Sequence, residues 1–66
     1  MTLNELFDVI EWSTPLHVDI DGYVYEGGKD EVALLLERDF IEPYNVFVVK
    51  VGGYDYAQYI ECVENK

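Results

Sequence analysis

The sequence has very little of the chemistry that disulfides and metal sites need. It contains one cysteine, Cys62, and one histidine, His17, in 66 residues. A single thiol cannot close an intramolecular disulfide, and small secreted domains usually carry several cysteines. One thiol and one imidazole are also too few for the usual zinc ligand sets. We therefore expect no disulfide, no metal site and a reducing, cytoplasmic setting.

Basic residues are the second shortage. Four Lys and Arg residues stand against fourteen Asp and Glu residues, which gives a formal net charge of -10. Nucleic acids and anionic membranes are bound by Lys and Arg, and a surface of this charge repels both. No apolar stretch is long enough for a signal peptide or a membrane span. The sequence predicts no direct binding of nucleic acid or membrane, and it favours a basic protein as partner.

Motifs of catalysis and cofactor binding are missing as well. His17 and Cys62 fall in different predicted hairpins, so a nucleophile and base pair is not indicated. Gly27-Gly28 and Gly52-Gly53 lack the strand, helix and Lys-Ser/Thr context of a phosphate-binding loop. Asp19 to Gly22 begins like a calcium loop, but its glycine comes two places early. We expect no enzyme activity, no catalytic residues, no cofactor and no metal ion.

A capping box opens the chain. Thr2 and Glu5 have the spacing at which each side chain satisfies a free amide of the first helical turn, so a helix should begin at Leu3. Ser13-Thr14-Pro15 should end it. Apolar residues at i, i+3, i+4 and i+7 then form one stripe of an amphipathic helix, namely Leu3, Leu6, Phe7 and Ile10.

Alternating apolar residues and turn residues predict two hairpins. Leu16 to Ile20 and Tyr23 to Glu26 flank Asp21-Gly22, a strong signal for a type I′ turn. The second hairpin should join Tyr44 to Val51 with Tyr54 to Ile60.

Gly52-Gly53 is expected to make a two-residue turn in this second hairpin. Such a turn places Lys50 opposite Asp55, Phe47 opposite Gln58 and Val46 opposite Tyr59.

A short helix from Glu31 to Glu37, with Asp30 as its N-cap, should lie between the hairpins. Pro43 prevents a helix from continuing into the second hairpin, and Glu64 to Lys66 should fray. The order αββαββ predicts a single α+β domain over residues 1–66, with an antiparallel four-stranded sheet of two hairpins and two short helices.

The second hairpin is apolar on both faces, although two short helices can cover only one side of the sheet. We expect the surplus face to be exposed as a homodimer interface or a partner-binding patch. The alternative is that one helix crosses the sheet and buries this face. The surplus residues are Tyr44, Val46, Val48, Ala57 and Tyr59.

Acidic side chains recur at spacings close to those between phosphates along a nucleic-acid strand, about 6.6 Å along a strand and about 5 to 6 Å along a helix. One hypothesis is that they present a phosphate-like array to a basic groove, and the other is that they only keep the protein in solution. The candidate array is Glu5, Asp8, Glu11, Asp19, Asp21, Glu26, Glu37, Asp39 and Glu42.

Several short motifs together resemble small acidic proteins of phages and prophages of Gram-positive bacteria. They are Met1 to Ile10, the hairpin that follows, Tyr25-Glu26-Gly27, and Leu35 to Asp39 before the last strands. The resemblance spans most of the chain, but the long Tyr-rich last hairpin departs from it.

Phage proteins of this size include anti-CRISPR and other anti-defence inhibitors that occupy nucleic-acid sites on host proteins. The resemblance therefore implies a non-enzymatic inhibitor, a nucleic-acid mimic acting in the host cytoplasm, with no catalytic residues to carry over. The alternative is a small homodimeric structural or assembly module.

Overall fold

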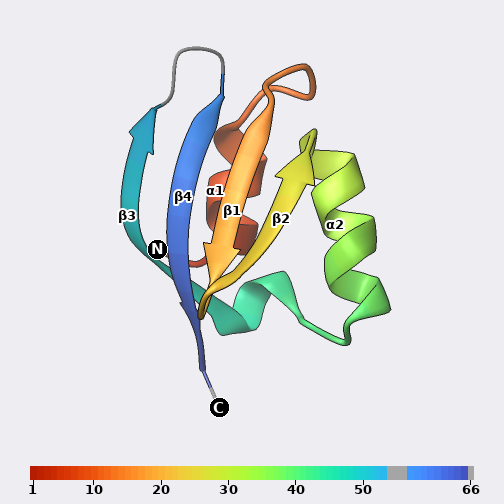
Figure 1. The fold of residues 1–66 in the computed structure, drawn as a ribbon, viewed down its shortest axis with the longest axis vertical. Coiled ribbons are helices and arrows are strands. Elements are labelled where there is room, and N and C mark those ends of the chain that lie inside the picture. The colour runs from red at the N-terminus through yellow and green to blue at the C-terminus, as the bar shows by residue number, and fades with distance from the viewer. Residues whose placement is uncertain (54–56, 66) are drawn as a thin grey trace.

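The computed structural model describes residues 1–53 and 57–65 and has an α+β fold with a four-stranded sheet (Figure 1). In chain order the elements are α1 (Leu3–Val9), β1 (Leu16–Ile20), β2 (Tyr23–Gly27), α2 (Lys29–Arg38), the 3-10 helix η1 (Pro43–Asn45), β3 (Val46–Gly53) and β4 (Gln58–Glu64). The α+β class, the two α-helices and the four strands agree with the sequence-based prediction, whereas η1 was not predicted.

The capping box at the start of α1 is present. The Thr2 hydroxyl accepts the Glu5 N–H at 3.2 Å, and the Glu5 carboxylate accepts the Thr2 N–H at 2.9 Å. This bond to the Thr2 backbone is the first cause that lowers the pKa of Glu5. α1 begins at Leu3, as predicted, and ends at Val9.

The sheet is mixed, with the strand order β2-β1-β4-β3. The outer pairs β1–β2 and β3–β4 are antiparallel, whereas the central strands β1 and β4 are parallel. An antiparallel sheet throughout was therefore the wrong prediction. The parallel pairing sets Ile60 beside Val18 and Cys62 beside Ile20, all of them buried, so the two hairpins share one apolar face.

The first hairpin has the predicted register, with Ile20 opposite Tyr23. Asp21 and Gly22 have φ angles of 52° and 92°, the positive values that a type I′ turn requires. The Asp19 carboxylate accepts the Gly22 N–H at 2.8 Å and supports the turn from one side.

The second hairpin does not have the predicted register. β3 continues through Gly53, which lies opposite Gln58, so Gly52-Gly53 is extended strand and not a two-residue turn. Lys50 is opposite Glu61, and Val46 is opposite Glu64. Asp55, the expected partner of Lys50, lies outside the described residues.

A β-bulge between Val48 and Lys50 contributes to this change of register. With this register Ile60 and Cys62 face the helices, where they are buried. A register that differs by an odd number of residues exchanges the two faces of a strand, so the burial of these two side chains favours the observed pairing.

α2 is longer than expected at both ends. Its N-cap is Gly28, not Asp30, and the Glu31 carboxylate accepts the Gly28 N–H at 3.3 Å. The end of β4 is also more ordered than predicted, because Asn65 exchanges hydrogen bonds of 2.9 and 2.7 Å with Asn45. Lys66 lies outside the described residues.

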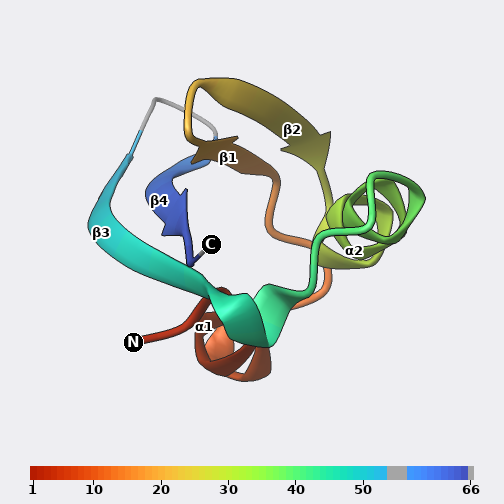
Figure 2. The ribbon, with the colours of Figure 1, turned by 90° about the horizontal axis from the view of Figure 1, so that it is seen from below.

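Both helices lie on the same side of the sheet, as the two views show (Figures 1 and 2). We call this side the inner face and the opposite side the outer face. The core between the helices and the inner face consists of Leu3, Leu6, Ile10, Leu16, Val18, Ile20, Tyr25, Val32, Leu36, Val46, Ile60 and Cys62.

Candidate binding surfaces

Two of the four basic side chains, Lys29 and Arg38, make contacts within the fold. Lys29 donates to the backbone carbonyl oxygens of Phe7 and Ile10, at 2.7 Å in each case, and its Nζ lies 4.6 Å from the centre of the Trp12 ring. Arg38 forms a 3.0 Å salt bridge with Asp39. Most carboxylates on the described part of the chain therefore have no nearby Lys or Arg to neutralise them.

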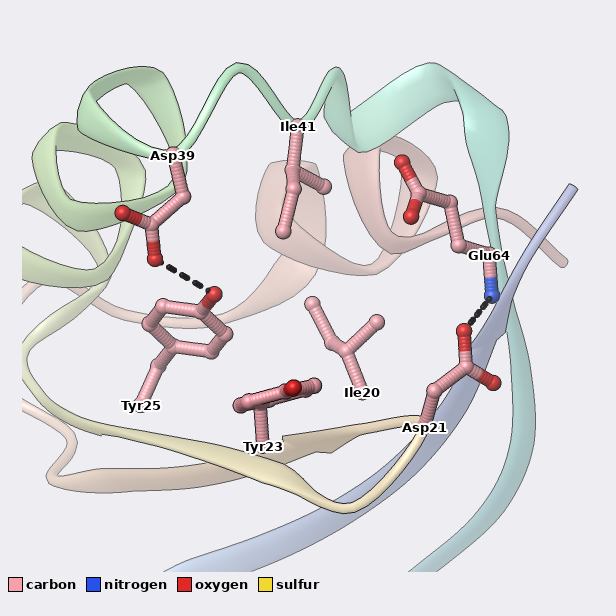
Figure 3. A pocket seen from close by; sticks show the side chains of 7 residues that line it. All are labelled: Ile20, Asp21, Tyr23, Tyr25, Asp39, Ile41 and Glu64. Atoms are coloured by element: carbon pink, nitrogen blue, oxygen red, sulfur yellow. Dashed lines mark hydrogen bonds between the residues drawn. The ribbon is translucent and has the colours of Figure 1, made fainter. Parts of the chain in front are cut away.

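One cavity collects three carboxylates, and we call it the acidic pocket (Figure 3). It has a volume of about 280 Å³ and lies at the end of the sheet where β1 turns into β2 and β4 ends. Its lining residues are Ile20, Asp21, Tyr23, Tyr25, Asp39, Ile41 and Glu64. Three segments that are far apart in the sequence thus meet here, namely the β1–β2 hairpin, the segment after α2 and the end of β4.

Two hydrogen bonds hold the walls of the acidic pocket together. The buried Tyr25 hydroxyl donates to Asp39 at 2.7 Å, and the Glu64 backbone N–H donates to the Asp21 carboxylate at 3.2 Å (Figure 3). They connect β2 to the segment after α2, and the β1–β2 turn to β4.

The surroundings of Tyr25 and Asp39 move their pKa values in opposite directions. Burial, followed by the hydrogen bond to Asp39, raises the pKa of Tyr25 to about 12. The Arg38 side chain, followed by the Tyr25 hydroxyl, lowers the pKa of Asp39. At neutral pH the pocket wall therefore combines a neutral phenol with an ionised carboxylate.

The acidic pocket suits an organic cation. Asp39 is already paired with Arg38, but the carboxylates of Asp21 and Glu64 add negative charge beside it, and Tyr23, which is 73% exposed, lines the same pocket. An ammonium or guanidinium group near such a ring gains a further 0.5 to 1 kcal/mol, roughly, at an exposed site. Among the described residues, no group of three or more His, Cys, Asp or Glu side chains has the geometry to hold a metal ion.

The predicted acidic array is divided among several parts of the molecule. Asp39 joins Asp21 in the acidic pocket, whereas Asp19 and Glu26 point to the outer face of the sheet. The remaining members lie on or just after the two helices: Glu5, Asp8, Glu11, Glu37 and Glu42. Glu64, a third carboxylate of the pocket, was missed because the chain end was expected to fray.

The predicted apolar patch does not exist as one surface. Val46 is fully buried and Val48 packs against the core, so both belong to the inner face. Tyr44 is exposed but lies in η1, Tyr59 lies on the outer face, and Ala57, which precedes β4, is half-buried. The observed register explains the error, because it places Val46 and Val48 with Ile60 and Cys62 rather than with Tyr59.

The outer face nevertheless carries apolar residues, which lie outside the predicted patch. Phe47, Val49 and Val63 are 43%, 59% and 45% exposed. A shallow hollow of about 280 Å³ adjoins them and is lined by Val49, Val63, Asp19, Asp21 and Glu61, with Gly22 and Cys62. Nearby, the rings of His17 and Tyr59 stack at 5.0 Å.

Scans against family models, curated proteins and solved structures found no match for this chain. Among the described residues, no helix is both long and apolar enough to cross a lipid bilayer.

Proposed function

We propose that this protein is a non-enzymatic interaction protein whose acidic surface binds a basic, nucleic-acid-binding protein. The observation that carries the proposal is the acidic pocket, in which carboxylates from separate segments converge beside an exposed tyrosine ring. A Lys or Arg side chain of the partner fits this lining by charge and by cation–π attraction.

The electrostatics of the whole chain support the same partner. The net charge is -10, and Lys29 and Arg38 are held by contacts within the fold. A field of this sign accelerates the approach of a basic surface and repels nucleic acid. The resemblance to phage proteins gives the most specific form of the proposal: an anti-CRISPR-like inhibitor that occupies a nucleic-acid site in the host cytoplasm.

The test is a pull-down with the purified protein from lysate of a Gram-positive host, at low and at high salt. The partner should be a nucleic-acid-binding protein, and its capture should fall as salt shortens the Debye length from about 10 Å at 0.1 M to about 3 Å at 1 M. Added DNA or RNA should compete with the protein for that partner. If neither salt nor added nucleic acid reduced the amount of captured partner, the result would contradict the proposal.

A matched pair of double variants tests the role of the acidic pocket. Asp21→Asn with Glu64→Gln removes two pocket charges, whereas Asp8→Asn with Glu11→Gln removes two exposed charges at α1 and just after it. Both variants have the same net charge. We expect the pocket variant to lose the partner and the α1 variant to keep it, and an equal loss in both would leave only a nonspecific charge effect.

A homodimeric assembly module is the second candidate. The observation that favours it is the exposed apolar group Phe47, Val49 and Val63 on the outer face. Sedimentation of the isolated protein over a range of concentrations decides this point, since a module of this kind should self-associate without any other protein.

A further inference from the structure

The outer face of the sheet has an apolar part and an acidic part next to each other. Phe47 and Val63 lie opposite each other on β3 and β4, and Val49 lies in the bulge that follows. Val49 and Val63 share one hollow with Asp19, Asp21 and Glu61. The apolar side chains are therefore bordered by carboxylates.

The acidic part of the outer face has more negative than positive side chains. Asp19 and Glu61 are register neighbours on β1 and β4, an arrangement of like charges that destabilises a sheet. Lys50, opposite Glu61 on β3, supplies one positive charge against the three carboxylates of the hollow. A cation from outside would relieve this repulsion.

We propose that the outer face is a docking surface for a basic amphipathic helix of the partner protein. The inference rests on the proposed function, because it takes the partner to be basic. The apolar stripe of the helix lies on Phe47, Val49 and Val63, and its Lys or Arg side chains reach Asp19, Asp21 and Glu61. The inner face of the same sheet is already covered by helices in this manner (Figure 2).

Charge identifies the occupant. A second copy of this chain would bring another net charge of -10 to the surface and would add carboxylates to a place that already has three. A basic helix brings the opposite charge and an apolar stripe of matching kind. Asp21 lines both the hollow and the acidic pocket, so one partner can contact both surfaces.

The experiment titrates the full chain with a synthetic helical peptide of about 18 residues, with leucine at i, i+3, i+4 and i+7 and lysine elsewhere. A peptide of the same composition, scrambled so that it has no apolar stripe, is the control. Amide NMR signals of β1, β3 and β4 should shift with the first peptide, and the scrambled peptide should bind more weakly. Shifts centred on the helices, or equal binding of both peptides, would overturn the proposal.

Variants matched in charge sharpen the result. Val63→Lys should weaken binding of the amphipathic peptide by about tenfold or more, whereas Leu34→Lys on the exposed side of α2 should change it by less than about twofold. Glu61→Gln and its control Glu37→Gln repeat the comparison without an added bulky charge, and thermal unfolding shows that each variant is folded. Equal effects within either pair would contradict the docking surface.

Two further outcomes separate this inference from the proposed function. Salt-sensitive binding with shifts centred on Tyr23 and Asp39 would leave the acidic pocket as the partner site and overturn the sheet-face assignment. No binding of the peptide even at low salt would count against both. Sedimentation of the chain alone that shows a dimer abolished by Val63→Lys would identify a second copy as the occupant, which would also overturn the inference.

Discussion

The ammonium nitrogen of Lys29 lies 2.7 Å from the carbonyl oxygen of Phe7 and ties the start of α2 to the end of α1. It makes a second bond of the same length to the carbonyl oxygen of Ile10. α1 has only seven residues, and the last carbonyl groups of a helix have no partner within the helix. Lys29 therefore satisfies groups that the short helix itself leaves unpaired.

We expect Lys29→Met to lower the free energy of unfolding by about 1 to 3 kcal/mol, because it leaves these carbonyl oxygens without their charged donor. Urea unfolding followed by circular dichroism measures the change. Lys50→Met is the matched control, since Lys50 is exposed on β3 and the loss of charge is the same. Equal destabilisation by both variants would show that net charge matters and the two carbonyl contacts do not.

The shifted pKa values of Tyr25 and Asp39, to which burial, Arg38 and their shared hydrogen bond contribute, predict two pH effects. The pKa of Tyr25 is raised from 10.0 to about 12, so the unfolded chain loses this proton first. The resulting stability is present below pH 10 and is lost as the pH rises toward about 12. The pKa of Asp39 is lowered, so its contribution is present above the pKa of the unfolded state and is lost on acidification through the folded pKa.

Tyr25→Phe removes this bond and should cost about 0.5 to 1.5 kcal/mol at neutral pH. Its stability should also fall less steeply than that of the wild type on the alkaline side. Urea midpoints measured across the two pH ranges check both statements. Parallel curves for the two proteins at alkaline pH would mean that Tyr25 is not the group that titrates there.

Local features of the fold could be predicted from the sequence. The Thr2–Glu5 cap and the Asp21-Gly22 turn depend on neighbouring residues, and both have the predicted form. The parallel pairing of β1 with β4 could not be predicted in this way, because alternation within a strand identifies its faces and not its neighbours. Gly52-Gly53 is compatible with a tight turn and with extended strand, and the pairing of residues up to Glu64 selects the strand.

The candidate sites depend on that same long-range information. The acidic pocket forms because the end of β4 lies beside the β1–β2 turn. No local sequence pattern around Glu64 predicts this contact. The sequence did show that the second hairpin has more apolar residues than one sheet face can bury. It also predicted that the helices leave one face of the sheet uncovered. Only the observed register of β3 with β4 shows that Val46, and not Phe47, faces the helices.

Phe40 predicts a stabilising substitution. It follows α2 in the left-handed region, with φ at 59°, and the Ile41 N–H donates to the Leu36 carbonyl across the turn, as in a Schellman motif. Its side chain is 92% exposed, so little packing would be lost. Phe40→Gly should raise the free energy of unfolding by about 1 kcal/mol, since glycine adopts this conformation without strain.

Phe40→Ala is the control for this prediction, because alanine removes the ring but keeps the Cβ that causes the strain. It should give less stabilisation than glycine in the same urea titration. If alanine stabilised the protein as much as glycine, removal of the exposed ring would be the cause and the backbone argument would fail.

Cys62 should be inert toward thiol reagents in the folded protein. It is buried, and burial followed by the charges of Asp19, Asp21 and Glu61 raises its pKa to about 12. The reactive thiolate is thus scarce at pH 8 and is also shielded. A chromogenic disulfide reagent should react slowly without urea and promptly in urea, and fast reaction of the native protein would contradict the buried position.

Substitutions at two consecutive positions of β3 test which face of the sheet the helices cover. Val46 is fully buried among core residues, whereas Phe47 is 43% exposed on the outer face. Val46→Lys places an unpaired charge in the core and removes apolar packing, so we expect a loss of about 3 kcal/mol or more, enough to unfold a domain of this size. Phe47→Lys adds the same charge to a surface that holds Glu61 and Asp19, and the protein should stay folded.

Circular dichroism and thermal unfolding of the two variants measure the difference. If Val46→Lys were folded and Phe47→Lys unfolded, the register of β3 and β4 would be wrong, and the outer face could not be the docking surface that we propose.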